Sequence, residues 1–335
     1  MQRVIINLSS SPHLIVAPLH GFTDAVFRDA FQRHFSGMDE AVAPFVSSVS
    51  GRRPIKPAYL KDLIPEPDAR LPVVPQILGN TADDFVFMAK ALADLGYTEI
   101  NWNLGCPYPM VAKKKRGAGL LPFPDTIDRM LDAIHHDFSG KISVKIRLGH
   151  YAPTEADALV PVFNRYPLAR IILHPRTGVQ MYTGKADPDA FERLLPQLVA
   201  PVVYNGDITR PEIFEGLFSR FPSISGWMIG RGLVADPFLG EILKSGVTPS
   251  AETRRNRFAA FHDDLVAGYQ ARLFGPRHVL DRMKGFWGYF AGQFPDSDRM
   301  LKNIRKTKTL AAYAEEVRKL MDDAAVFKKE RKIYP

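Results

Sequence analysis

From residue 14 to residue 229, short apolar runs alternate with longer segments whose apolar residues recur every three or four positions. The short runs predict β-strands at 14–17, 41–46, 73–78, 99–103, 142–146, 170–173, 201–204 and 226–229. The longer segments predict helices at 24–34, 82–95, 127–138, 155–166, 188–195 and 211–220. Alternating β and α units indicate a parallel sheet. Eight strands over about 240 residues favour an α/β fold of the (β/α)8 TIM barrel type over a doubly wound sheet.

The pattern changes near residue 245. Pro237, Gly246 and Pro249 mark a boundary, and no further strand is predicted beyond it. Helical spacing returns at 251–273, 277–290, 298–307 and 311–329. The sequence therefore predicts a barrel domain at 1–245, followed by a small C-terminal helical bundle at 246–335.

Charge is concentrated in the predicted bundle. The chain has a net charge of +8, and residues 251–335 hold 18 Lys and Arg against 11 Asp and Glu, so that they carry +7 of it. Such a concentration suggests an attachment surface for a polyanion. A solvated helix face is the plainer interpretation.

Composition restricts the class of protein further. Of 335 residues, 46% are hydrophobic, and Cys106 is the only cysteine, which excludes an internal disulfide framework. No apolar run approaches the ~18 residues of a membrane span, and residues 1–11 do not resemble a secretory signal. We expect a cytoplasmic protein without a membrane partner, and a monomer.

Cys106 follows the predicted strand 99–103 in a loop that contains Gly105, Pro107 and Pro109. A lone cysteine often does no more than pack in a core. A rigid loop after the carboxyl end of a barrel strand is, however, where catalytic residues of this fold lie. Cys106 is therefore a candidate catalytic residue.

Other polar and glycine-rich positions also follow predicted strands. Gly206 follows the seventh predicted strand and Gly230 follows the eighth, where barrels build a phosphate site. Arg231 adds a cation there. A lysine at 145 that points into the barrel needs an anion, although a lysine at the rim could also reach solvent. The full set of positions after strands is Ala17, Pro18, Leu19, Gln76, Asn103, Cys106, Lys145, Arg147, His174, Arg176, Asn205, Gly206, Asp207, Gly230, Arg231 and Gly232.

Two of these side chains suit a heterocycle. The amide of Gln76 can donate and accept, as an imide edge requires, and His174 could donate to a ring carbonyl or serve a structural role. No metal site is predicted, because the nine histidines are scattered and Cys106 has no second thiol. A P-loop and an early Rossmann turn are also absent from the sequence.

The motifs together resemble the tRNA-dihydrouridine synthases, FMN-dependent reductases with a TIM barrel and a C-terminal helical domain. The resemblance rests on Ala17-Pro-Leu-His-Gly-Phe-Thr-Asp24, Phe27-Arg28, Gln76-Ile-Leu-Gly79, Asn103-Leu-Gly-Cys-Pro107, Val111, Gly117-Ala-Gly-Leu-Leu121, Val144-Lys-Ile-Arg-Leu-Gly149, His174-Pro-Arg-Thr177, Tyr182, Asn205-Gly-Asp-Ile208 and Ile229-Gly-Arg-Gly232. Leu19 stands where the family usually has methionine, and 41–46 lacks its usual Thr-Glu pair. Residues 113–116 form an unusually basic run.

The resemblance implies that NADPH reduces FMN, that hydride passes to C6 of a D-loop uridine in tRNA, and that Cys106 protonates C5. It implies FMN contacts from Ala17, Pro18, Leu19, Gln76, Lys145, His174, Asn205, Gly206, Asp207, Gly230 and Arg231. Lys145 would stabilise negative charge on the reduced ring. The expected tRNA contacts come from Asn103, Arg176, Tyr182, Lys113, Lys114, Arg282 and Lys284.

Two other functions fit parts of the sequence. A flavin barrel that reduces a free pyrimidine would explain Gln76, Lys145 and Cys106 but would give the basic bundle no task. A non-catalytic RNA-binding module would use the bundle and leave the barrel mouth unexplained. The sequence does not indicate which uridine is the target.

Overall fold

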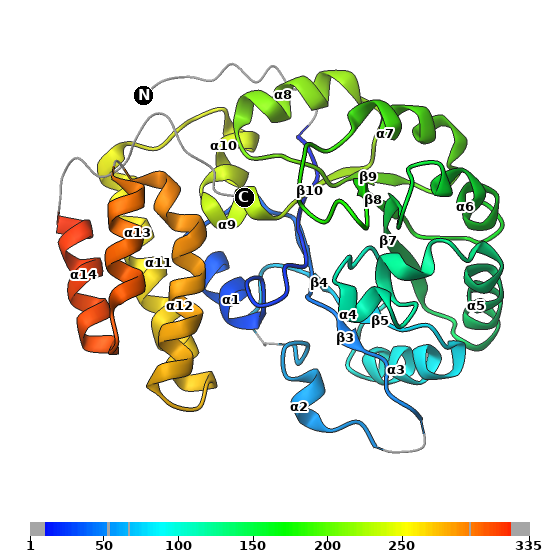
Figure 1. The fold of residues 1–335 in the computed structure, drawn as a ribbon, viewed down its shortest axis with the longest axis horizontal. Coiled ribbons are helices and arrows are strands. Elements are labelled where there is room, and N and C mark those ends of the chain that lie inside the picture. The colour runs from blue at the N-terminus through cyan, green and yellow to red at the C-terminus, as the bar shows by residue number, and fades with distance from the viewer. Residues whose placement is uncertain (1–10, 52–53, 66–67, 295, 323–335) are drawn as a thin grey trace.

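The computed structural model describes residues 11–51, 54–65, 68–294 and 296–322 (Figure 1). Within them, all strand pairs are parallel and belong to one sheet. The strands are β1 Leu14–Val16, β2 Glu40–Val42, β3 Val46–Ser47, β4 Val73–Val74, β5 Gln76–Leu78, β6 Glu99–Leu104, β7 Lys141–Gly149, β8 Ile171–Thr177, β9 Val202–Tyr204 and β10 Gly226–Ile229.

Two of the eight predicted strands are each broken into two pieces. The predicted strand 41–46 becomes β2 and β3, and the predicted strand 73–78 becomes β4 and β5, with Pro44 and Pro75 at the breaks. Proline has no N–H for the ladder, so pairing stops there. β2 pairs with β4 and β3 pairs with β5, while β1 joins β2 to β10 and β6 continues from β5. Because β2 with β3, and β4 with β5, each take one position in the sheet, the ten strands close into a barrel of eight strand positions (staves). The predicted TIM barrel is confirmed.

Helices cover the outside of the barrel (Figure 1). They are α1 Ala25–His34, α3 Ala82–Asp94, α5 Pro124–Asp137, α6 Glu155–Phe163, α7 Pro188–Leu194, α8 Pro211–Arg220 and α10 Leu239–Ser245. Shorter helices lie in the connections: α2 Pro57–Leu60, α4 Pro109–Ala112 and α9 Arg231–Ala235, with 3-10 turns at Gly117–Leu120, Leu195–Gln197 and Ala291–Gln293. None of the described helices is long and apolar enough to cross a membrane.

The C-terminal helices are α11 Ala251–Arg272, α12 Pro276–Phe290, α13 Ser297–Lys306 and α14 Leu310–Asp322, and they lie together beside α1 (Figure 1). The predicted helix 311–329 begins one residue earlier, and its end lies outside the described residues. Phe27 and Phe35 of the α1 region contact Phe261 of α11 at ring distances of 5.8 and 5.0 Å. One hydrophobic core therefore continues from the barrel into the bundle. The division at residue 245 stays a prediction.

Alternation along the strands sorts the side chains into an inner and an outer set. Inside the barrel, a small apolar cluster consists of Ile15, Ala17, Val42, Val74, Ile172, Val203 and Met228. Val144 and Ile146 of β7 belong to the larger core outside the strands, so Lys145 between them points into the barrel. This orientation is the one that the sequence predicts.

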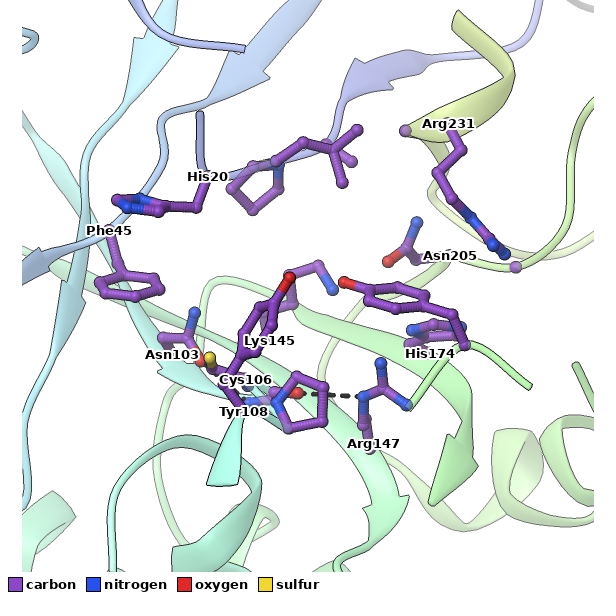
Figure 2. A pocket seen from close by; sticks show the side chains of 18 of the residues that line it. His20, Phe45, Asn103, Cys106, Tyr108, Lys145, Arg147, His174, Asn205 and Arg231 are labelled. Atoms are coloured by element: carbon purple, nitrogen blue, oxygen red, sulfur yellow. Dashed lines mark hydrogen bonds between the residues drawn. The ribbon is translucent and has the colours of Figure 1, made fainter. Parts of the chain in front are cut away.

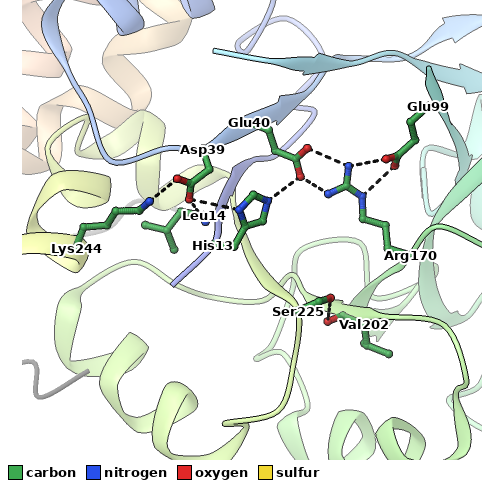
Figure 3. Close-up of polar contacts among 9 residues, drawn as sticks. All are labelled: His13, Leu14, Asp39, Glu40, Glu99, Arg170, Val202, Ser225 and Lys244. Atoms are coloured by element: carbon green, nitrogen blue, oxygen red, sulfur yellow. Dashed lines mark hydrogen bonds and ion pairs between the residues drawn. The ribbon is translucent and has the colours of Figure 1, made fainter. Parts of the chain in front are cut away.

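The base of the barrel is closed by an ion cluster (Figure 3). Arg170, just before β8, pairs with Glu40 of β2 and, at 3.0 Å, with Glu99 of β6. His13 Nε2 lies 3.1 Å from Glu40. Burial alone would raise the pKa of Glu40, but hydrogen bonds from His13 and Arg170 outweigh it and lower this pKa to about 2. The cluster ties three staves together at the end opposite the candidate site.

The pKa of Glu40 predicts how acid affects stability. Because it is lower in the folded chain than the ~4.3 of an unfolded glutamate, the pairing stabilises the fold above that value and is lost as pH falls toward 2. Glu40→Gln lacks this contribution at every pH. As the pH falls toward 2, its free energy of unfolding should therefore decrease by about 2 to 3 kcal/mol less than that of the wild type. Urea unfolding from pH 5 to pH 2 measures it. Asp68→Asn, an exposed position, is the control, and an unchanged pH dependence in Glu40→Gln would contradict the assignment.

Candidate active site

A cavity of about 750 Å3, including its opening, lies at the carboxyl ends of the strands (Figure 2). Its walls come from the strands β6, β7 and β8, from the loops after β1, β6, β8, β9 and β10, and from Phe45 between β2 and β3. It brings together thirteen of the residues for which a catalytic, cofactor or substrate contact is predicted, from segments far apart in the sequence. The lining is Ala17, Pro18, Leu19, His20, Phe45, Asn103, Gly105, Cys106, Pro107, Tyr108, Lys145, Arg147, His174, Tyr182, Asn205, Gly206, Asp207, Gly230 and Arg231.

The loop that carries Cys106 is fixed by the side chain of Asn103. Asn103 Oδ1 accepts hydrogen bonds from the backbone N–H groups of Gly105, at 3.1 Å, and Cys106, at 2.8 Å. On the other side, the Cys106 carbonyl accepts from Ala118 N–H at 3.0 Å. Gly117 has a φ of +56°, and a Cβ there would lie 2.6 Å from the Cys106 carbonyl oxygen. Only glycine allows this approach, so the segments 103–107 and 117–121 pack directly on each other.

Gln76 lies one layer deeper than predicted. It does not line the cavity and is fully buried. Its Oε1 accepts from Asn103 Nδ2 and its Nε2 donates to Asn101 Oδ1, both at 2.7 Å, and Asn101 donates onward to Ser143 Oγ at 2.9 Å. Both halves of the Gln76 amide are therefore used inside the protein, where they orient Asn103.

Lys145 faces the cavity without a counter-charge. Among the described residues its ammonium has no recorded ion pair or hydrogen bond, and burial, followed by the charge of Arg147, lowers its pKa to about 7. Burial raises the pKa of the Cys106 thiol, more than Arg147 and Lys145 lower it. The cavity thus holds a thiol that stays protonated at neutral pH and a lysine whose charge an anion would stabilise.

The sequence places Arg147 at the end of a predicted strand but predicts no contact with a cofactor or substrate for it. It is 2% exposed and donates to the Gly105 carbonyl at 3.0 Å. It also donates to the carbonyls of Thr177 at 2.8 Å and Met181 at 2.7 Å. Arg147 thereby joins the loop of Cys106 to the loop after β8. The alternation along β7, which also places Lys145, is the signal that could have identified it.

Arg176 and Asp207 form a buried pair behind the cavity wall. Arg176 is 2% exposed and donates to both carboxylate oxygens of Asp207, at 2.9 and 2.7 Å. It also donates to His174 Nε2 at 3.0 Å. Burial, and then the charges of nearby Arg and Lys residues, hold the pKa of His174 well below its usual range, so the ring is neutral. Arg176 itself does not line the cavity, so it orients His174 and Asp207 from behind.

The opposite end of the cavity is cationic and has little side-chain bulk. Arg231 donates to Asp207 at 2.9 Å and lies over the ring of Tyr182 at 5.0 Å. Gly206 and Gly230 line the same end, and a Cβ on Gly230 would lie 3.1 Å from Ala17. Asn205 donates to the Met228 carbonyl at 2.9 Å, which holds the turn between β9 and its helix. Figure 2 shows Arg231 and Asn205 across the cavity from Cys106.

Apart from Arg176, the predicted lysine and arginine contacts to tRNA fall into two groups. Lys113 and Lys114 are exposed after α4, next to the loop of Cys106. Arg282 donates to the Gly21 carbonyl and Lys284 to the carbonyls of Thr307 and, at 3.0 Å, Arg305. Arg282 and Lys284 are half-buried and each donates to backbone carbonyls of the protein, and their contact with tRNA stays a prediction. Sequence spacing could not show these backbone partners.

Further cations border a groove beside the cavity. Lys302, Arg305 and Lys306 of α13 are exposed and line a groove with Tyr289 of α12. Tyr289 packs against the ring of Phe22 at 4.9 Å, and Phe22 belongs to the loop after β1 that also carries His20 of the cavity wall. The groove thus adjoins the cavity. Within the described part of the chain, no cluster of His, Cys, Asp and Glu could hold a metal ion.

Comparison with known proteins identifies the family. The model of the dihydrouridine synthase family matches residues 15–324. A probable tRNA-dihydrouridine synthase of Rhodobacter capsulatus is 29% identical over 80% of this chain and 82% of its own length. A tRNA-dihydrouridine(16) synthase of Shewanella oneidensis is 27% identical over 93% of this chain and 98% of its own.

Among solved structures, a mutant morphinone reductase in complex with tetrahydroNAD has a TM-score of 0.49 and 10% identity, over 73% of this chain and 91% of its own. The family match extends over nearly all of the barrel and the bundle. Dihydrouridine has two hydrogen atoms more than uridine, so a synthase that makes it from uridine is a reductase. The chain belongs to the dihydrouridine synthase family, as its motifs predict, and is an oxidoreductase.

Proposed function

We propose that this protein uses FMN, reduced by NADPH, to convert a D-loop uridine of tRNA to dihydrouridine, with Cys106 as the proton donor. The observation that carries the proposal is the pairing in one cavity of a protonated thiol with the unpartnered ammonium of Lys145. Family membership supplies the substrate class.

The donor set of the cavity fits a flavin mononucleotide. Lys145 would stabilise negative charge on the ring, and Arg231 with the backbone at Gly206 and Gly230 would hold the phosphate. Ala17, Pro18 and Leu19 line the wall between these two ends. FMN supplies a hydride to C6 of the uracil when it is bound and reduced. His174 is neutral and can donate through Nδ1, because its Nε2 accepts from Arg176.

Cys106 suits the role of a general acid. Its thiol lines the cavity, and burial keeps it protonated at neutral pH. The hydrogen bonds of Asn103 and the packing of Gly117 fix its position. Asn103 and Tyr182 face the same space and are the proposed uracil contacts. Arg176 donates to His174, whose ring centroid lies 6.4 Å from that of Tyr182.

The tRNA would lie over the cavity and the groove of α13. Exposed Lys113 and Lys114 follow α4, next to the loop of Cys106, and exposed Lys302, Arg305 and Lys306 line the groove. A target base inside folded tRNA must be extruded, and contacts to the backbone on both sides compensate for the lost stacking. Cations on two sides of one cavity suit that task.

Cellular tRNA provides the test of the proposed function. The purified protein should be yellow, and tRNA from cells that lack it should lose dihydrouridine at one or a few positions. Sequencing of tRNA with and without the protein measures this and identifies the target position. Normal dihydrouridine in the deleted cells, or reduction of free uridine without tRNA, would contradict the proposal.

Replacement of the thiol separates flavin binding from proton transfer. Cys106→Ala should keep bound flavin and the oxidation of NADPH without tRNA, while the rate of dihydrouridine formation falls about 100-fold or more. Single-turnover measurements with reduced enzyme test this. Because the pKa of the thiol is raised, the wild-type rate should stay level through neutral pH and fall only above the ordinary value near ~8.5. A wild-type dihydrouridine yield from Cys106→Ala would exclude the acid assignment.

Salt dependence tests the groove. If Lys302 and Arg305 each contact a phosphate, the double variant Lys302→Ala/Arg305→Ala should lower the slope of log affinity against log salt by about 1 to 2. Lys90→Ala, an exposed lysine of α3 on the barrel wall, is the matched control. Arg282 and Lys284 do not offer a clean test, because their removal breaks internal hydrogen bonds. An unchanged slope in the double variant would place the tRNA elsewhere.

A further inference from the structure

Two aromatic side chains at the cavity stack on each other without a part in the proposed chemistry. The ring centroids of His20 and Phe45 are 5.4 Å apart, with 11° between the ring planes. Both residues line the cavity. Figure 2 shows the pair at the end that holds Asn103 and Cys106, across from Arg231.

Core packing does not explain this pair. Ala43 is buried in the core and Val46 packs against it, whereas Phe45 between them belongs to neither set. His20 is exposed. A stacked pair with one outer face in solvent, at the edge of a substrate cavity, leaves that face available for a third flat ring.

The loop that carries His20 is held from both sides. Thr23 Oγ1 donates to the Ala17 carbonyl at 2.8 Å and accepts from Leu19 N–H at 2.8 Å. From the bundle, Arg282 donates to the Gly21 carbonyl. Because these bonds fix the backbone on each side of His20, the stacked pair is preorganised, and little conformational entropy is lost when a ligand binds to it.

The depth of the cavity indicates what this ring would be. Cys106 is only 8% exposed, whereas His20 is exposed at the edge. A uracil that reaches the thiol occupies the interior, so the next nucleotide of a continuous RNA chain lies at the edge. Single-stranded bases at such sites stack on aromatic side chains, which contribute about 1 to 3 kcal/mol for each base.

We propose that His20 and Phe45 form a stacking platform for the nucleobase that adjoins the target uridine in the RNA chain. This inference rests on the proposed function, because it needs the uracil at Cys106. It assigns to His20 and Phe45 a contribution to RNA affinity that depends on a base and not on a phosphate.

Equilibrium binding of unmodified tRNA to the oxidised holoenzyme, without NADPH, tests the platform. His20→Ala and Phe45→Ala should each weaken binding about 5- to 150-fold. Flavin content and NADPH oxidation without tRNA should stay at the wild-type level. The slope of log affinity against log salt should also stay unchanged, because no phosphate contact is removed. His20→Phe and Phe45→Tyr keep flat rings and should bind as the wild type does.

A tRNA that lacks one base identifies the partner of the platform. Two tRNAs are compared, each abasic at the nucleotide on one side of the target uridine. With one of them, wild-type binding should weaken as it does in His20→Ala, and His20→Ala should cause no further loss. If the alanine variants bind intact tRNA as tightly as the wild type, or if they lose the same factor with both abasic tRNAs, the inference is wrong.

The two proposals can fail separately. A wild-type holoenzyme that binds no tRNA and forms no dihydrouridine would overturn the proposed function and the platform with it. A wild-type holoenzyme that forms dihydrouridine, with alanine variants that differ only in their salt slope, would overturn the platform alone and indicate a phosphate contact at His20.

Discussion

The hydrogen bonds that Asn103 accepts from the backbone of Gly105 and Cys106 determine the geometry of the site. Asn103 is itself held by Gln76, and Gln76 by Asn101. A buried polar chain therefore extends from the interior of the barrel to the loop of Cys106. Buried amides are costly unless they are paired, so each member restricts the orientation of the next. The position of the Cys106 thiol therefore depends on the barrel wall and not only on its own loop.

The same cavity and its walls hold more positive than negative charge, which favours the binding of an anion. Arg176 and Arg231 share the carboxylate of Asp207, and Arg147 donates to backbone carbonyls. Lys145 is left without an anionic partner among the described residues. Burial and these cations keep His174 neutral, so it can offer a hydrogen bond without adding charge. Burial and Arg147 lower the pKa of Lys145, and an anion bound beside it would favour its charged form.

The sequence predicted the staves, the inward direction of Lys145 and the positions after the strands, because these follow from local periodicity. It predicted the motifs at 103–107 and 117–121 but not the contact between them, because the fit of Gly117 against Cys106 depends on a backbone distance. It assigned Gln76 to the flavin, whereas the side chain meets Asn103 first. It also assigned Arg282 to RNA because the residue is a cation in a basic helix. Which carbonyl such a cation meets depends on tertiary packing.

The partner of Arg282 links the two parts of the molecule. The guanidinium donates to the Gly21 carbonyl, and Phe22 packs its ring edge against Phe286 and Tyr289, at 5.3 and 4.9 Å. The loop after β1 thus lies against α12 on one side and lines the cavity on the other. Tyr289 also borders the basic groove of α13. Close packing and hydrogen bonds hold this loop against α12. If a tRNA binds in the groove, the same loop that carries His20 would therefore fix its position relative to Cys106.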